Sequence, residues 1–220
     1  MNQSDMLKRY GMFIAGVIFS ALGISLITKA GLGTAPLTSL AYVLTFIFPY
    51  SLGTFTMIVN TIMFICQVIL LGKSFQKIQL LQVPSAFLFS VCIDMWLSVL
   101  SGWNTGNYVG AVIMLLAGCV FLGFGISLEV IPNVLILPGE GLVRTIAGLT
   151  GWRFGRVKMG FDLSIVISAV VLSFAVRGQI LGIREGTVIA ALIVGNISHF
   201  FIEKVSNFLE GWIPPYVRTE

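Results

Sequence analysis

Residues 109–128 read VGAVIMLLAGCVFLGFGISL and contain no charged side chain. An apolar stretch of about 20 residues is long enough to cross the hydrocarbon core of a bilayer as a helix. The rest of the chain has the same character, since 57% of its 220 residues are hydrophobic and only 10% are charged. A soluble domain has about 25% charged residues. The composition therefore excludes a soluble protein and predicts an all-α, polytopic transmembrane bundle.

The end of this stretch, GISL at 125–128, also occurs at 23–26, which is 102 positions earlier. The same offset brings further landmarks together, namely Gly16 with Gly118, Pro36 with Pro138, Gly53 with Gly155 and Asp94 with Asn196. A fixed period of this kind indicates a duplicated unit. We predict one membrane domain over 1–220, with a first repeat at about 11–100, a second at about 109–202 and a short C-terminal tail at 203–220.

Each predicted repeat contains three long apolar stretches and one short segment. The long stretches are 11–28, 53–71 and 82–100 in the first repeat, and 109–128, 155–176 and 186–202 in the second. The short segments are 36–49 and 138–150. A helix of about 13 residues rises only about 20 Å, whereas the hydrocarbon core is about 30 Å thick. We therefore expect each short segment to be a half-helix or a re-entrant piece.

Two topologies are open at this stage. If the short segments do not cross the membrane, each repeat has three crossings and the repeats are inverted; if they do cross, each has four and the repeats are parallel. Basic residues prefer the cytoplasmic side. With three crossings, Lys8, Lys73 and Lys77 share that side, whereas Arg177 and Arg184 face outward. The first repeat therefore favours the inverted arrangement, and the second does not decide.

The best candidates for a functional site are the glycine- and proline-rich stretches at 31–36 and 132–141. Non-helical backbone survives at membrane depth only where protein or a water-filled cavity satisfies its polar groups. A matched pair of interrupted segments in two repeats is typical of a transporter's binding site. Pro36 and Pro138 would each open a short helix, whose free N–H groups favour an anionic ligand. The alternative interpretation is that both stretches are ordinary loops outside the membrane.

Charged residues gather in one stretch of the second repeat. Glu140 and Arg144 are four residues apart, and so are Lys158 and Asp162, so each pair could be a structural ion pair. They could instead line a polar cavity together with Arg156. We predict a substrate-binding set that combines these residues with polar and proline positions of both repeats: Thr34, Pro36, Thr38, Asn60, Pro138, Glu140, Arg144, Arg156, Lys158 and Asp162.

Asp94 is the only acidic residue between Asp5 and Glu129. Ionisable residues in apolar segments are costly and often mark ion or proton pathways. Asp94 is therefore our candidate for proton coupling. The alternative is that it lies near the end of its helix and bonds to a neighbouring backbone group or hydroxyl.

Several function classes are not supported by any motif. There is no phosphate-binding loop, no paired zinc ligands and no nucleophile elbow, and Cys66, Cys92 and Cys119 have no close cysteine or histidine partner. We expect neither an enzyme nor a cofactor or metal site. The formal net charge of +4 is explained by orientation signals in loops rather than by nucleic-acid binding. The expected partners are the lipid bilayer and a small-molecule substrate, and a homodimer is compatible with the sequence.

Four segments together resemble the YczE/YitT-type bacterial integral membrane proteins. They are GLGTAPLT at 31–38, IDMW at 93–96, PGEGL at 138–142 and TGWRFGRVKMGFDLSIVI at 150–167. The family typically has an acidic residue where this chain has Thr38, whereas Glu140 lies near the acidic position of the second motif. The resemblance covers about 8–202 and implies a multi-pass protein of the bacterial cytoplasmic membrane. It supplies no substrate.

The sequence therefore favours a small transporter or permease for an anionic solute, with a midplane site at two interrupted helices. The alternative is an accessory or scaffold protein for another membrane or biosynthetic complex, in which the polar residues serve packing and assembly. An intramembrane enzyme acting on lipid would need convergent nucleophile and base residues, and the sequence offers no such set.

Overall fold

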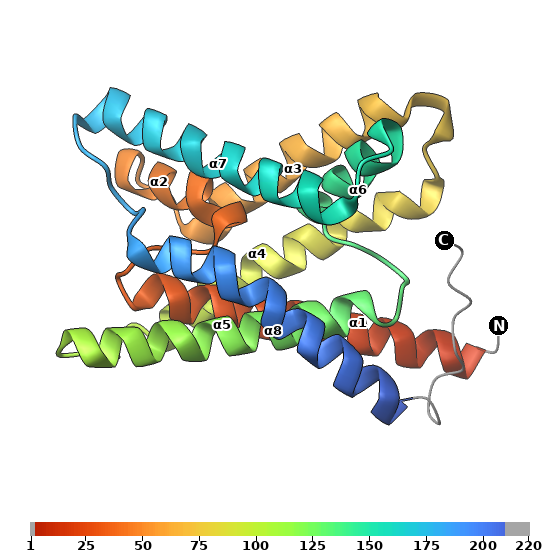
Figure 1. The fold of residues 1–220 in the computed structure, drawn as a ribbon, viewed down its shortest axis with the longest axis horizontal. Helices are drawn as coiled ribbons and strands as arrows, with labels where there is room; N and C mark the ends of the chain where they lie inside the picture. The colour runs from red at the N-terminus through yellow and green to blue at the C-terminus, as the bar shows by residue number, and fades with distance from the viewer. Residues whose placement is uncertain (1–2, 210–220) are drawn as a thin grey trace.

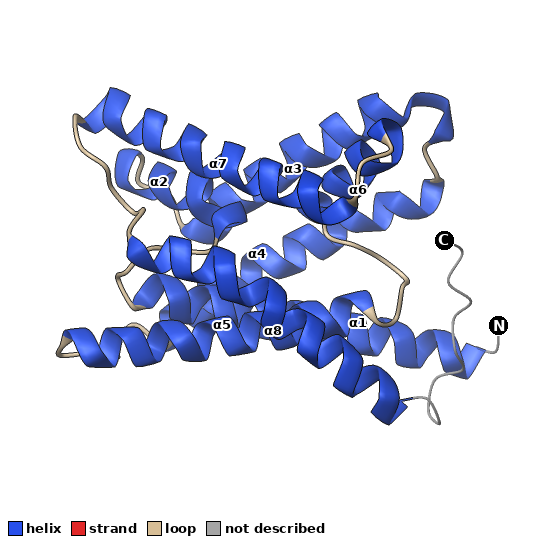
Figure 2. Cartoon of the chain, viewed as in Figure 1, coloured by secondary structure: helices blue, strands red, loops and turns tan. Residues whose placement is uncertain are grey.

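A computed structural model describes residues 3–209, and all regular structure in that range is helical (Figures 1 and 2). The long helices are α1 (Gln3–Lys29), α3 (Leu52–Leu71), α4 (Gln82–Val99), α5 (Tyr108–Val130), α7 (Phe154–Arg177) and α8 (Glu185–Leu209). The short ones are α2 (Ser39–Ile47), α6 (Pro138–Thr150) and the 3-10 turns η1 (Pro36–Thr38), η2 (Gly72–Ser74) and η3 (Lys77–Leu81). The predicted all-α fold is confirmed.

Six of these helices are long and apolar enough to cross a membrane. They divide three and three between the predicted repeats, which leaves α2 and α6 as the short segments that the sequence predicts. Helices satisfy their backbone hydrogen bonds internally, so they can form where no water is available. The chain is therefore a multi-pass membrane protein.

Local signals set the helix boundaries. The Ser51 hydroxyl accepts a hydrogen bond from the Thr54 N–H (3.1 Å) at the start of α3, and the Asn107 side chain does the same for Gly110 (2.8 Å) at α5. Gly151 ends α6 in the left-handed conformation that glycine adopts without strain (φ 69°). The prediction for the last helix is too short: α8 continues to Leu209, so the predicted tail begins inside a helix, and 210–220 lie outside the described residues.

The helices form two layers joined by α4 (Figure 1). Helices α1, α5 and α8 pack together in one layer, and α2, α3, α6 and α7 form the other. Helix α4 packs against both α1 and α3. The short turn η1 contacts α7 in one layer and α8 in the other, so the segment that opens at Pro36 lies between the layers.

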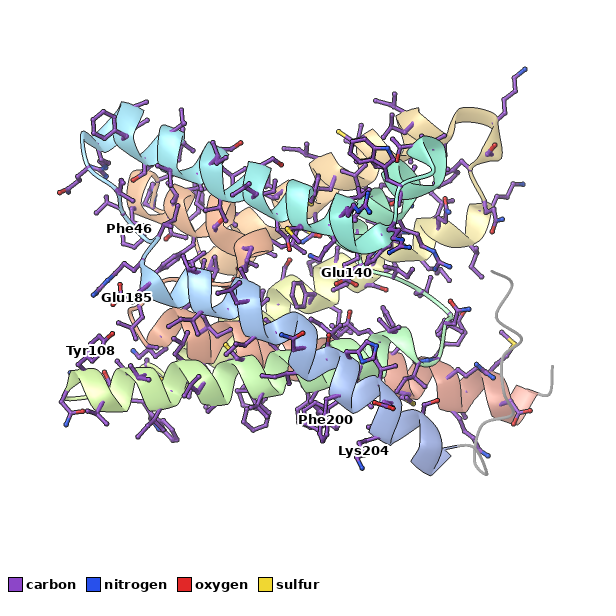
Figure 3. The ribbon with its side chains drawn as sticks, in the orientation of Figure 1. Phe46, Tyr108, Glu140, Glu185, Phe200 and Lys204 are labelled. Carbon is purple, nitrogen blue, oxygen red and sulfur yellow. The ribbon has the colours of Figure 1, made fainter. Side chains whose placement is uncertain are left out.

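The first helices of the two halves, α1 and α5, start at opposite ends of the molecule (Figure 1). Helix α1 begins and α8 ends at one end of the molecule (Figure 1). Figure 3 shows Phe46 of α2 near the other end, where Tyr108 begins α5 and Glu185 begins α8. Glu140, in the first turn of α6, lies in the middle of the long axis in the same view.

Helices α1 and α5 pack antiparallel along a seam of glycines. A methyl group on Gly16 would lie 2.8 Å from Cγ of Glu129, and one on Gly118 would lie 2.7 Å from Cγ1 of Ile27. Small residues let helix backbones approach closely, which is the main source of helix association in lipid. The offset of 102 maps the first of these contacts onto the second, with Ile27 standing where the second half has Glu129. The duplication itself stays a prediction.

Candidate functional site

Buried threonines hold the stretch that precedes α2. The hydroxyl of Thr34, which is fully buried, lies 2.9 Å from that of Thr28 and 3.0 Å from that of Thr38. The Thr34 N–H donates to the hydroxyl of Thr187 at the start of α8 (3.1 Å). Gly33 has a φ of 126° and leaves no space for a side chain beside Thr187, so this position requires glycine. These bonds fix the place where Pro36 opens the short helix.

The matching stretch in the second half is held from α1. Arg9 is buried and donates from Nη1 to the carbonyl of Pro132 (2.9 Å). Leu137 is extended, and Pro138 then opens α6 at its first position, where a missing N–H costs nothing. Both prolines therefore begin short helices, as the sequence predicts.

The starts of the two short helices meet in the interior. A methyl group on Gly139, the second residue of α6, would lie 3.6 Å from Cδ1 of Leu37, the second residue of η1. It would lie 3.4 Å from Sδ of Met63, in the middle of α3. Segments about 100 residues apart in sequence thus come into contact at their N-terminal turns, where free backbone N–H groups point outward from the helix.

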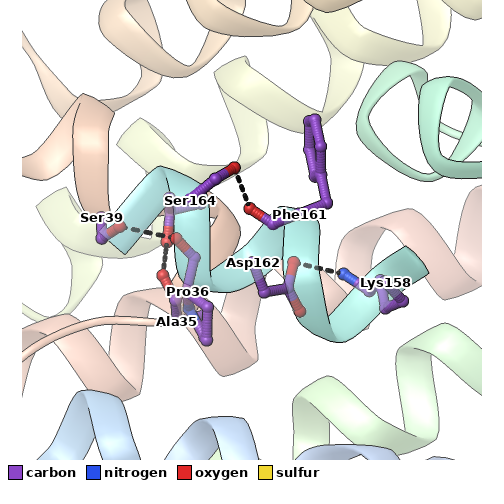
Figure 4. A network of polar contacts seen from close by, with 8 residues as sticks. Ala35, Pro36, Ser39, Lys158, Phe161, Asp162 and Ser164 are labelled. Carbon is purple, nitrogen blue, oxygen red and sulfur yellow. Dashed lines mark hydrogen bonds and ion pairs between the residues drawn. The ribbon is translucent and has the colours of Figure 1, made fainter. Parts of the chain in front are cut away.

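Helix α7 adds an ion pair to this region. Lys158 Nζ lies 2.9 Å from Oδ1 of Asp162, and both side chains are about three-quarters buried. Helix α7 packs on η1, and Figure 4 shows Asp162 on the side of the pair nearer to Ala35 and Pro36, with Lys158 beyond it. The structural ion pair of Lys158 with Asp162, one of the two interpretations of this spacing, is present. Glu140 and Arg144, both within the described residues, form no ion pair with each other.

The remaining predicted residues are dispersed. Arg144 and Arg156 are exposed, so they lie away from the buried helix starts. Asn60 is half-buried on α3 and donates to the Thr56 carbonyl of its own helix (2.9 Å). Thr34, Pro36, Thr38 and Pro138 are buried, and Glu140 is half-buried. Whether any of these residues binds a substrate stays a prediction.

Asp94 caps a neighbouring helix. Its carboxylate accepts one hydrogen bond from the Gly53 N–H (2.7 Å) and another from the Ser51 hydroxyl (2.6 Å). Both donors belong to the start of α3, where a negative charge offsets the helix dipole. This geometry matches the structural interpretation of Asp94, and its role in proton coupling stays a prediction.

A pair of buried amides surrounds the first turn of α6. Gln67 and Gln82 are 2% and 4% exposed, and their Oε1 atoms have no hydrogen-bond partner among the described residues. A methyl group on Gly141 would lie 2.7 Å from Oε1 of Gln67. Buried acceptors without partners are rare in native proteins. They mark the α3, α4 and α6 junction as a polar region inside the bundle.

A buried carboxylate lies in the last turn of α5. Glu129 is 4% exposed and accepts a hydrogen bond from the Ser20 hydroxyl of α1 at 2.6 Å. Within the described residues, no group of three histidine, cysteine or acidic side chains is arranged to hold a metal ion.

Comparison with known families assigns the chain to one of them. A family model described as "Family of unknown function (DUF6198)" matches residues 7–203. The chain belongs to the DUF6198 family. It is 28% identical over 208 residues to "Uncharacterized membrane protein YczE" of Bacillus subtilis (strain 168), covering 94% of this chain and 91% of that protein. It is also 28% identical over 203 residues to "Uncharacterized protein YyaS" of the same organism, covering 90% and 94%. No solved structure matches.

The predicted resemblance to YczE-type proteins is therefore confirmed. In this DUF6198 member, sequence reasoning missed Glu129, Gln67 and Gln82. A signal for Glu129 exists, since it is an acid that directly continues the apolar run 109–128. The two glutamines offer no such signal, because a glutamine near a helix end is usually exposed.

Proposed function

We propose that the protein is a small transporter in which α2 and α6 are re-entrant half-helices. Their N-terminal turns would form one site near the middle of the membrane, and the solute would carry an anionic group. The contact of Leu37 with the position of Gly139 carries this proposal, because it joins two matched interruptions at one point. Matched interrupted helices of this kind form the substrate sites of known secondary transporters.

The charges around the helix starts support an anionic group. The N-terminal end of a helix has a partial positive charge, and its free N–H groups donate hydrogen bonds. Lys158 adds a cation on α7, which packs on η1, although Asp162 offsets this charge and lies nearer to Pro36 in Figure 4. In this proposal Arg144 and Arg156 act at the surface, where exposed positive charge raises the local concentration of anions.

A thermal-stability screen of the purified protein in detergent tests the proposal. The probes are short mono- and dicarboxylates, inorganic phosphate and sulfate. A ligand that binds only the folded protein at 100 times its Kd stabilises it by about 2.7 kcal/mol. We expect at least one anion to raise the melting temperature in a saturable way. No stabilisation by any of these probes would contradict the proposal and favour an accessory or scaffold role.

Two alanine substitutions of glycines on α6 test where the anion binds. Gly139→Ala adds a methyl group at ordinary contact distance from Leu37 and Met63, so it should fold but weaken anion binding at least tenfold. Gly148→Ala is the control, because nothing lies within 4 Å of the added carbon. Equal affinity in the two variants would place the anion elsewhere.

A further inference from the structure

Glu129 is a buried ionisable group that the proposed solute site does not use directly. It lies in the α1–α5 seam, is 4% exposed and accepts its hydrogen bond from Ser20 of the opposite helix. Taking a carboxylate out of water is costly unless it is neutralised or well bonded. Acidic residues in this setting within membrane helices often serve proton relays.

Glu129 packs directly against α1, and the hydroxyl of Ser20 is the bonding partner of its carboxylate. A methyl group on Gly16 would lie 2.8 Å from both Cγ and the backbone nitrogen of Glu129. The side chain is thus pressed against the backbone of α1. A sodium or potassium ion would need several oxygen ligands around it, whereas a proton needs only the carboxylate and a hydroxyl.

Ser20 can serve both forms of Glu129. Its O–H donates to the ionised carboxylate, and its oxygen can accept from the O–H of the protonated acid. By the offset of 102, Leu122 is the counterpart of Ser20 in the other repeat, and Ile27 is the counterpart of Glu129. Both Leu122 and Ile27 are buried. The polar pair therefore occupies one of two equivalent places in the seam, and apolar packing suffices at the other.

Charged groups are present on each element that neighbours Glu129. Arg9 lies two turns before Gly16 on the same face of α1 and donates to the Pro132 carbonyl. Glu140, at the start of α6, follows Glu129 by 11 positions. Helix α8 also packs on α5 and carries His199, Glu203 and Lys204, which are all exposed. A buried carboxylate responds strongly to charges placed near it, so a further anion near α6 can change the protonation of Glu129.

We propose that Glu129, with Ser20 as its partner, binds the proton that is transported together with the solute. This inference rests on the proposed function. An anion at the start of α6 adds negative charge to the interior of the bundle and thereby favours the protonated form of Glu129. The proton comes from water on the side where the solute enters, bonds to a carboxylate oxygen, and returns to water when the solute leaves on the other side. Solute and proton therefore move in the same direction.

Infrared difference spectroscopy of the reconstituted protein tests proton binding without any solute. Spectra between acidic and alkaline buffer should contain the carbonyl stretch of a buried carboxylic acid. We expect Glu129→Gln to lose this band and Asp94→Asn to keep it. A band that persists in Glu129→Gln overturns the proposal, and so does a wild-type spectrum without it.

A second variant decides the matter if Glu129→Gln does not fold. Ser20→Ala keeps the carboxylate and removes the donor to its ionised form, so the titration midpoint of the band should move to higher pH. Leu122→Ala is the control at the equivalent place in the seam and should leave the midpoint unchanged. An unshifted midpoint in Ser20→Ala would show that the band belongs to another group and overturn the assignment.

Anion binding separates this proposal from the proposed function. Inorganic phosphate and a short dicarboxylate are titrated at two pH values on either side of the band's midpoint. We expect at least tenfold tighter binding at the lower pH for wild type and no more than twofold for Glu129→Gln. Equal pH dependence in both proteins contradicts coupling while anion transport stands. Absence of anion binding at both pH values contradicts the proposed function, and the coupling fails with it.

Discussion

Helices α3 and α4 pack closely, whereas the corresponding helices α7 and α8 barely contact each other. The other packing partners correspond well: α4 packs on α1 as α8 packs on α5, and α3 packs on α6 as α7 packs on α2. The difference is therefore confined to one contact. We call the first half, in which α3 packs on α4, the closed half. We call the second half, in which α7 and α8 barely contact each other, the open half.

Polar contacts of Asp94 with Ser51 and Gly53, which we call the latch, hold α3 against α4 in the closed half. Asp94 of α4 binds the N–H of Gly53 and the hydroxyl of Ser51, and Gly53 leaves no space between α3 and the Ser90 carbonyl. At the corresponding place in the open half, Asn196 is exposed and donates to the Leu192 carbonyl of its own helix (3.1 Å). Nothing lies within 4 Å of a methyl group placed on Gly155.

The helices of the open half are fixed to the first half of the chain instead. Arg177, at the end of α7, donates to the Phe46 carbonyl of α2. The N–H of Gly186, near the start of α8, donates to the Leu32 carbonyl (2.8 Å) in the stretch that leads to Pro36. Movement of α7 relative to α8 would therefore act on the segment that opens at Pro36, whereas α3 and α4 would move as a unit.

The largest effect is expected from Gly53→Ala. The added carbon would lie 2.5 Å from Oδ2 of Asp94 and still closer to the Ser90 carbonyl, so α3 and α4 must separate. Overpacking of this kind costs about 1–3 kcal/mol. Gly155→Ala, the matched change in α7, should be neutral or slightly stabilising, because alanine is the better helix former. Reversible unfolding in mixed micelles measures both, and equal destabilisation would contradict the latch.

Asp94→Ala should have the next largest effect. It removes the acceptor of the Gly53 N–H and the Ser51 hydroxyl together, and loss of a helix cap costs about 0.5–2 kcal/mol. Asn196→Ala is the matched change and should stay within about 0.5 kcal/mol of wild type, as exposed substitutions usually do. The same unfolding assay compares them. A cost at Asn196 equal to that at Asp94 would remove the distinction between the two halves.

Ser51→Ala should have the smallest effect. The Thr54 N–H loses its acceptor, but Asp94 still accepts from Gly53, so about 0.5–1 kcal/mol is expected. Arg153, at the corresponding start of α7, makes no side-chain cap, and Arg153→Ala should be close to neutral. If Ser51→Ala costs as much as Asp94→Ala, the hydroxyl rather than the carboxylate carries the latch. Hydrogen exchange at the start of α3 would then rise in both variants equally.

Much of the fold could be predicted because its signals are local. The run at 109–128 and the prolines at 36 and 138 mark a spanning helix and two short ones, and the structure has α5, α2 and α6 there. The spacing of Lys158 and Asp162 allowed a structural ion pair, and the structure has that pair, whereas their membership of a binding site stays a prediction. Charge alone does not tell which ionisable residue is buried: Arg144 and Arg156 are exposed, whereas Glu129 is buried.

The sequence by itself determined the class of protein and the positions of the two interruptions, and it left six or eight crossings open. Hydropathy and the backbone preferences of proline and glycine act within one or two turns, so they can be read without knowing the fold. Only the tertiary structure decided which polar groups meet. Ser20 and Glu129 are 109 positions apart, and Asp94 lies 41 positions from Gly53. Such pairs depend on how closely two helices approach, and glycines at the contact set that distance once the helices are packed.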